Sequence, residues 1–173
     1  YRLATEAPLR ADLRVGQHFK GDAFSYFPAG FEVFDVIDRA GRRPVGGEWG
    51  DEPALQGVRL AEGLALVAFK SVEHSVTYER WEDFERFLEE EGLGWAKAVH
   101  AARGLAPFPV TEVYRRFARS LIAVGNGQGQ DRSAGFALEI LALENPYVEK
   151  GGVTFEVRGV SAPLSGVQVA VFE

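Results

Sequence analysis

Cysteine is absent from the 173-residue sequence. Disulfides, thiolate metal ligands and cysteine nucleophiles are therefore excluded. Long apolar runs are missing too, because none approaches the roughly 18 residues that a membrane-spanning helix needs. We expect a soluble protein that does not insert directly into a membrane. The sequence opens at Tyr1 without an initiator methionine or a signal segment, so we expect that an upstream start has been removed.

Motifs for catalysis are also lacking. The sequence contains no GxSxG nucleophile elbow and no HxH or HExxH spacing. The glycine cluster at residues 125–129 lacks the Lys-Ser/Thr pair of a phosphate-binding loop and predicts a flexible turn. We therefore predict that the protein is not an enzyme. Convergence of side chains from distant loops is the alternative that the sequence leaves open.

The charge balance argues against two classes of partner. The sequence has 19 basic and 25 acidic residues, and its net charge is −6. Nucleic acids and anionic membrane surfaces favour a basic stripe, so we expect neither as a partner. The sequence does have a high apolar content, with 46% hydrophobic residues and 13 phenylalanines. This content predicts a folded core rather than disorder.

Alternation of apolar and polar residues predicts most of the secondary structure. We expect strands at residues 9–15, 31–38, 64–72, 136–143, 153–158 and 167–171. Residues 42–45 would return from the turn that follows the second strand. The third strand has a nearly continuous apolar run, so we expect it to be central in its sheet.

Helical spacing appears in one block between these strands. Apolar residues at helical spacing predict a helix from residue 81 to about residue 91 and a second short helix at residues 95–102. Val113 and Phe117 belong to a series that recurs every four residues. With an N-cap at Thr111, this series predicts a third helix that reaches about residue 120.

The clustering of the helices favours a mainly β fold. We predict an antiparallel β-sandwich with a helical insertion at about residues 79–120. The alternative is a parallel α/β sheet, in which strands and helices would alternate throughout the chain.

His18 and Asp22 are the candidate metal ligands. They lie four residues apart, in a segment that follows the first predicted strand. Imidazole and carboxylate groups are suitable ligands for nickel, cobalt or zinc. The alternative for His18 is a loop histidine hydrogen-bonded to the backbone. We interpret His74 and His100 as packing or surface residues.

Trp49 is a candidate for ligand stacking. It lies in a loop and would stack on a sugar, and with Phe24 and Tyr26 it would form a surface aromatic patch. The carboxylates of the first predicted helix are interleaved with arginines, so we interpret them as a solvated helix face.

A set of segments covers most of the chain and carries a family resemblance. They are residues 9–22, 84–93, 114–124, 145–147 (Asn-Pro-Tyr) and 163–169. The set resembles a secreted bacterial family of unassigned function that is similar to the periplasmic component of ABC-type cobalt or nickel transport systems. The resemblance implies an exported protein with immunoglobulin-like sandwich domains. It also implies a first domain at residues 1–148 and, at residues 149–173, strands of a second, incomplete domain resembling the carboxypeptidase regulatory β domain.

Two functions follow as hypotheses. The first is a periplasmic, non-catalytic protein that binds nickel or cobalt through His18 and Asp22 and has a membrane transporter subunit as a partner. The second is a structural or adhesive module of the cell envelope that binds protein or glycan through its sandwich edges or its helical insertion, and it predicts a surface aromatic patch. The second predicts that metal leaves the melting temperature unchanged.

Overall fold

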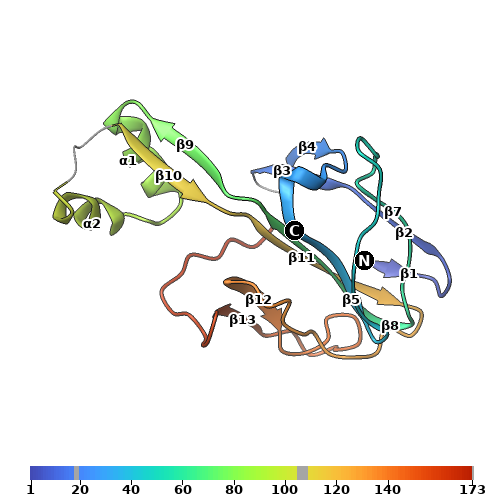
Figure 1. The fold of residues 1–173 in the computed structure, drawn as a ribbon. Helices are drawn as coiled ribbons and strands as arrows, with labels where there is room; N and C mark the ends of the chain where they lie inside the picture. The colour runs from blue at the N-terminus through green and yellow to red at the C-terminus, as the bar shows by residue number, and fades with distance from the viewer. Residues whose placement is uncertain (18–19, 105–108, 173) are drawn as a thin grey trace. The chain divides into compact units, whose positions relative to one another are not determined.

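The computed structural model of the protein describes residues 1–17, 20–104 and 109–172. These residues form two compact units (Figure 1). Unit 1 contains residues 1–72, residues 116–165 and Phe172. Unit 2 contains residues 73–115 and 166–171. Most of unit 2 is therefore an insertion within the sequence of unit 1.

A five-stranded sheet in the order β1-β11-β8-β5-β6 is the centre of unit 1. Its strands are β1 (Arg2–Leu3), β11 (Phe117–Val124), β8 (Gly63–Ser71), β5 (Phe31–Asp38) and β6 (Gly41–Pro44). Neighbouring strands are antiparallel except for β1 and β11, which are parallel. The sequence-based expectations of a β5–β6 hairpin and a central β8 are confirmed.

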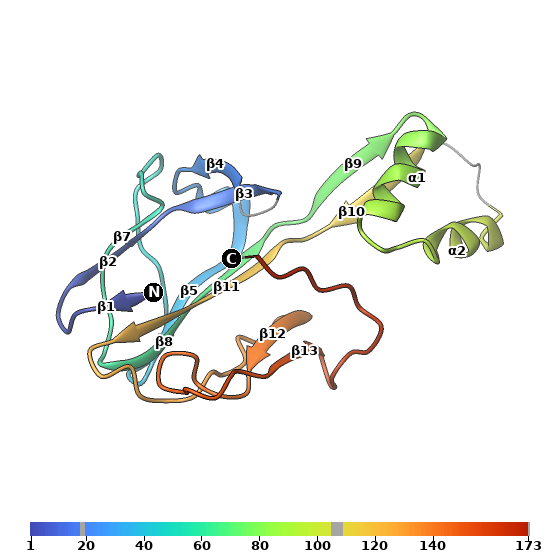
Figure 2. The same ribbon diagram turned by 180° about the vertical axis from the view of Figure 1, so that it is seen from behind.

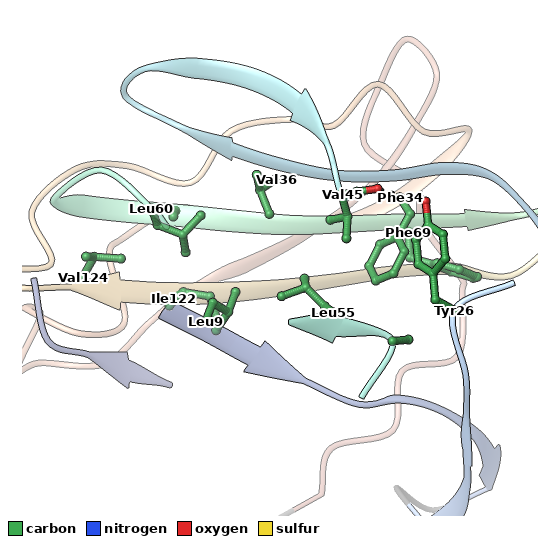
Figure 3. Packing of buried hydrophobic residues seen from close by; sticks show 12 residues of the cluster. Leu9, Tyr26, Phe34, Val36, Val45, Leu55, Leu60, Phe69, Ile122 and Val124 are labelled. Atoms are coloured by element: carbon green, nitrogen blue, oxygen red, sulfur yellow. Dashed lines mark hydrogen bonds between the residues drawn. The ribbon is translucent and has the colours of Figure 1, made fainter. Parts of the chain in front are cut away.

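One face of this sheet packs against two small sheets. They are β2 (Pro8–Ala11) with β7 (Leu55–Arg59), and β3 (Leu13–Gln17) with β4 (Lys20–Phe24). Figure 3 shows the core that results, in which Leu9 and Leu55 meet side chains of the five-stranded sheet such as Phe69 and Ile122. Tyr26, just before the short 3₁₀ helix Pro28–Gly30, packs at the edge of this cluster.

The opposite face of the sheet has a second core. Leu66 and Ala68 of β8 pack there with Ala134 and Phe136. This face is on the side of β12 (Leu138–Ala142) and β13 (Phe155–Gly159), which pair with each other (Figure 2). Covering on both faces explains the nearly continuous apolar run of β8. The predicted mainly β sandwich with a helical insertion is confirmed.

Unit 2 contains a two-stranded ribbon and helices. The ribbon pairs β9 (His74–Tyr78) with β10 (Val110–Tyr114), and the helices are α1 (Trp81–Glu90) and α2 (Ala96–Ala102). Phe84 and Leu88 of α1 pack against Val110 of β10 in a core of their own. Gly92 follows α1 with a φ of +67°, a left-handed conformation that favours glycine at this position.

The predicted third helix was wrong. Residues 111–114 belong to β10 and residues 117–120 are the first half of β11. The helices therefore occupy residues 81–90 and 96–102 rather than the whole of residues 79–120. A spacing of four residues is also a multiple of the two-residue strand period. Phe117 and Leu121 therefore share one face of β11, where they pack against the second core of unit 1.

Other predicted strands changed their bounds or partners. The strand expected at residues 9–15 is divided, because β2 pairs with β7 whereas β3 pairs with β4. Residues 167–171 have no strand partner among the described residues, so the strand expected there was also wrong. β13 pairs with β12, and both lie in unit 1. The assignment of residues 149–173 to a second domain stays a prediction.

Candidate functional site

The predicted metal pair is only partly described. Asp22 lies on β4 opposite Val15, and its side chain is exposed. His18 lies outside the described residues. Within the described ranges, no group of three or more His, Asp or Glu side chains is placed to hold a metal ion. The pairing of His18 with Asp22 stays a prediction.

The two described histidines lie against aromatic rings. His74 stacks on Tyr114 with ring centroids 5.6 Å apart. His100 lies 6.0 Å from the ring of Trp81 and 6.1 Å from that of Phe84. These contacts agree with their interpretation as packing or surface residues.

An exposed aromatic surface is formed by Trp49 and Phe27. Their ring centroids are 4.6 Å apart in an edge-to-face arrangement. The side chain of Trp49 is 75% exposed and that of Phe27 is 42% exposed. Of the predicted patch, Phe24 is also exposed, whereas Tyr26 is buried. We call Trp49 and Phe27 the aromatic surface.

The turn that carries Trp49 is joined to Tyr26 by two backbone hydrogen bonds. The N–H of Tyr26 donates to the C=O of Asp51 at 2.9 Å, and the N–H of Gly50 donates to the C=O of Tyr26 at 3.0 Å. Inside the turn, the N–H of Asp51 donates to the C=O of Glu48 at 3.1 Å. The Asp51 carboxylate accepts in return from the N–H of Glu48 at 2.8 Å. These bonds restrain the backbone under Trp49.

Tyr26 supports this turn from inside the core. Its hydroxyl donates to the C=O of Val45 at 3.1 Å. Its ring lies against Gly47, where an added Cβ would approach the ring to 2.9 Å. A glycine is needed at position 47 because any larger residue would push the turn off the tyrosine.

Acidic side chains flank Trp49 in the same loop. Glu48 and Glu52 are exposed, and Asp51 is half-buried. Carboxylate oxygens accept hydrogen bonds from hydroxyl groups, while the indole face offers a flat apolar contact. The loop can therefore hold a ligand that has an apolar face and a rim of hydroxyl donors.

A cleft of about 610 Å³ lies between the layers of unit 1. Its walls come from β2 and β3 on one side and from the five-stranded sheet on the other, with Leu13, Phe34, Val67 and Phe69 among the lining residues. The lining is mostly apolar, so the cleft is suited to hydrophobic side chains rather than to acid–base chemistry.

A buried charge cluster lies on the other face of β11. The Arg119 guanidinium approaches Asp131 at 2.7 Å and Glu139 at 3.1 Å, and all three side chains are at most 9% exposed. The Glu139 carboxylate accepts hydrogen bonds from the Ser133 hydroxyl and from the N–H groups of residues 134–136. Burial by itself would raise the pKa of Glu139, but these bonds and the charge of Arg119 hold that pKa below its usual value.

Asp38 is a second buried carboxylate. It accepts hydrogen bonds from Arg43 at 2.9 Å and from the N–H groups of Ala40 and Ala61. Burial would raise the pKa of Asp38, but these donors outweigh burial and lower it. Both buried carboxylates already have their partners, so they act as structural groups that fix loops to the sheet.

Comparison with known proteins gives one match. The sequence model of a family described as "Domain of unknown function (DUF4198)" matches residues 1–173. The chain belongs to this family. Detectable similarity of the DUF4198 domain to a curated protein or to a solved structure is not found. In the part of the domain that the structure describes, no helix is long and apolar enough to cross a membrane.

The sequence analysis identified one of the two residues of the aromatic surface. Trp49 was a candidate because it lies among glycines and acidic residues, whereas Phe27 was missed. The signal for Phe27 is Pro28, which begins the short 3₁₀ helix and leaves the preceding side chain at the end of a loop. The buried ions Arg119 and Glu139 gave no signal, because charged residues are mostly exposed in proteins.

Proposed function

We propose that this DUF4198 domain is a non-catalytic binding module that holds a glycan on the aromatic surface. The observation that carries the proposal is the 75% exposure of Trp49 on a turn that is hydrogen-bonded internally and to the backbone of Tyr26. A large apolar side chain in water on a mobile loop would lose much conformational freedom on binding. A side chain on a fixed turn loses little, so more of its contact energy appears as affinity.

The surroundings of Trp49 favour a glycan over a flat apolar protein surface. The ring of a neutral sugar has an apolar face of C–H groups that suits the indole, and its hydroxyls suit the flanking carboxylates Glu48 and Asp51. A protein patch rich in leucine or valine would bury these carboxylates without partners, at a cost in free energy. The net charge of −6 also favours a neutral glycan over an acidic polysaccharide.

Replacement of Trp49 by alanine is expected to weaken glycan binding roughly 5- to 160-fold, because a stacked aromatic contact is worth about 1–3 kcal/mol. The measurement is retention on insoluble cellulose, chitin and peptidoglycan, followed by calorimetry with soluble oligosaccharides of the retained type. Trp95→Ala is the matched control, because Trp95 is 65% exposed but lies in unit 2. Equal retention of both variants, or retention of neither the native chain nor the variants, would reject the proposal.

A second proposal is a transition-metal site for nickel or cobalt at His18 and Asp22. It is supported by the family resemblance and by the exposed carboxylate of Asp22 on β4. The resemblance also supports export to the periplasm and a membrane transporter subunit as partner. In this proposal the protein binds the metal and passes it on, without catalysis.

The metal proposal predicts a calorimetric signal with Ni²⁺ or Co²⁺ that His18→Ala removes. Asp22→Asn should weaken it by about 10-fold or more, because it replaces a charged ligand by a neutral one. Asp12→Asn is the control, because the exposed carboxylate of Asp12 lies just before β3, away from Asp22 on β4, and is already paired with Arg14. A titration without heat for the native chain, or an unchanged titration for His18→Ala, would exclude this site.

A further inference from the structure

The loop that carries Trp49 is acidic and has no cation of its own. No Lys, Arg or His occurs between Arg43 and Arg59, and both of these arginines pair with carboxylates outside the loop. The acidic residues of the loop are Glu48, Asp51 and Glu52. Among the described residues, no Lys or Arg forms an ion pair with any of the three. Within this part of the chain, the negative charge beside the aromatic surface is therefore not neutralised.

The turn brings these carboxylates to both sides of Trp49 along the chain. Glu48 directly precedes Trp49, and the N–H of Asp51 closes the turn on the C=O of Glu48 at 3.1 Å. The Oδ2 of Asp51 accepts from the N–H of Glu48 at 2.8 Å, and a carboxylate has a second oxygen that can accept further bonds. Glu52 follows the turn, and the side chains of Glu48 and Glu52 are exposed. A ligand stacked on Trp49 therefore meets carboxylates at the ends of the same turn.

A positively charged ligand group suits these surroundings better than a hydroxyl group does. Hydrogen bonds from a cation to a carboxylate are roughly twice as strong as hydrogen bonds between neutral groups. A cation is also attracted to the face of an aromatic ring, most strongly to that of tryptophan. Trp49 and Phe27 provide two exposed rings at an interplanar angle of 73°. A sugar ring that carries a protonated amine can use the apolar contact, the carboxylates and the aromatic faces together.

We propose that the glycan held on the aromatic surface carries free amines, as a chain of glucosamine units does, and that Glu48 and Glu52 select it. The inference rests on the proposed glycan-binding function and names its substrate class. Stacking on Trp49 is available to any sugar with an apolar face. The two carboxylates distinguish the amine from its acetylated form, which has the same ring and no charge. The net charge of −6 adds attraction at longer range.

The test compares two oligosaccharides of equal length, the hexamer of glucosamine and the hexamer of N-acetylglucosamine. Each is titrated calorimetrically at about pH 5.5, where the carboxylates are ionised and the sugar amines are protonated. We expect the native chain to bind the glucosamine hexamer roughly 10-fold more tightly, since each exposed ion pair contributes a factor of up to about five. Glu48→Gln/Glu52→Gln keeps the side-chain shapes and should reduce this preference to about 2-fold or less. Added salt should reduce it in the native chain too.

The matched control is Glu82→Gln/Glu90→Gln, which removes the same charge from exposed positions of α1 in unit 2 and should keep the preference. An equal loss in this control would overturn the inference, because net charge alone would then attract the amines. Equal affinity of the native chain for both hexamers would overturn it as well, while the proposed glycan-binding function would stand. Binding of neither hexamer would also overturn it, and retention on cellulose or peptidoglycan then decides whether the glycan-binding function stands.

Discussion

Replacement of Glu139 by alanine is expected to lower the free energy of unfolding by about 3–5 kcal/mol, the range for breaking a buried ion pair from one side. The side chain of Glu139 is 2% exposed, and its carboxylate lies 3.1 Å from the Nε of Arg119. Its removal leaves a guanidinium in the protein interior with only Asp131 to balance it. It also leaves the N–H groups of the turn at residues 134–136 without their acceptor. Urea unfolding followed by circular dichroism measures the loss.

The matched control is Glu82→Ala, which removes a carboxylate from an exposed position of α1 and should change stability by less than about 0.5 kcal/mol. Glu139→Gln adds a further comparison, because it keeps the shape of the side chain and loses the charge. It should fall between the native protein and Glu139→Ala. A loss for Glu139→Ala no larger than that of the control would show that water reaches the charge cluster.

Stability is expected to fall steeply in acid, because two buried carboxylates have pKa values below their usual ones. The pKa values of Asp38 and Glu139 would be raised by burial, but the hydrogen bonds and positive charges around them lower both. A group with a lowered pKa in the folded state binds protons more tightly when the chain is unfolded. Its contribution is complete above the ordinary values of 3.8 and 4.5 and is lost as the pH falls through the folded-state values.

The measurement is the urea midpoint from about pH 6 to about pH 2, a range that spans the ordinary carboxylate pKa values. In the double variant Asp38→Asn/Glu139→Gln, the midpoint should be lower at neutral pH and should depend less on pH. Glu82→Gln should follow the native curve, because its carboxylate is exposed in α1. Parallel curves for the native protein and the double variant would show that other groups cause the acid transition.

The sequence predicted those helices and strands in which apolar residues recur with a single period. β5 was predicted at the bounds that it has, since residues 31–38 alternate and end at a turn. α1 was predicted because its apolar residues recur only at helical spacing. β10 and the first half of β11 were mistaken for a helix because a four-residue repeat fits both periods. The choice between them depends on pairing with β9 and β8, and such long-range contacts leave no local trace.

Of the candidate site, Trp49 was predictable because it is a large apolar residue in a loop that is expected to be exposed. A tryptophan in a Gly-rich, acidic loop is unusual enough to be noticed from the sequence. The sequence could not show that Phe27 is exposed beside Trp49 whereas Tyr26 is buried beneath the turn. Several aromatic residues lie close together in this part of the sequence, and only packing decides which of them is buried. The strand predicted at residues 167–171 was wrong because a strand also needs a pairing partner. These residues alternate as in a strand, but the described residues provide no neighbouring strand for them.

The insertion of unit 2 has a consequence for how this family can vary. The chain leaves unit 1 after Val72 and returns at Arg116, and the two ends are joined there by a hydrogen bond from the N–H of Ser71 to the C=O of Arg116 at 3.0 Å. Because β8 and β11 are neighbours in the sheet, any segment with closely spaced ends is compatible with that junction. A longer, shorter or unrelated segment between these two strands is therefore expected to leave the sheet of unit 1 unchanged.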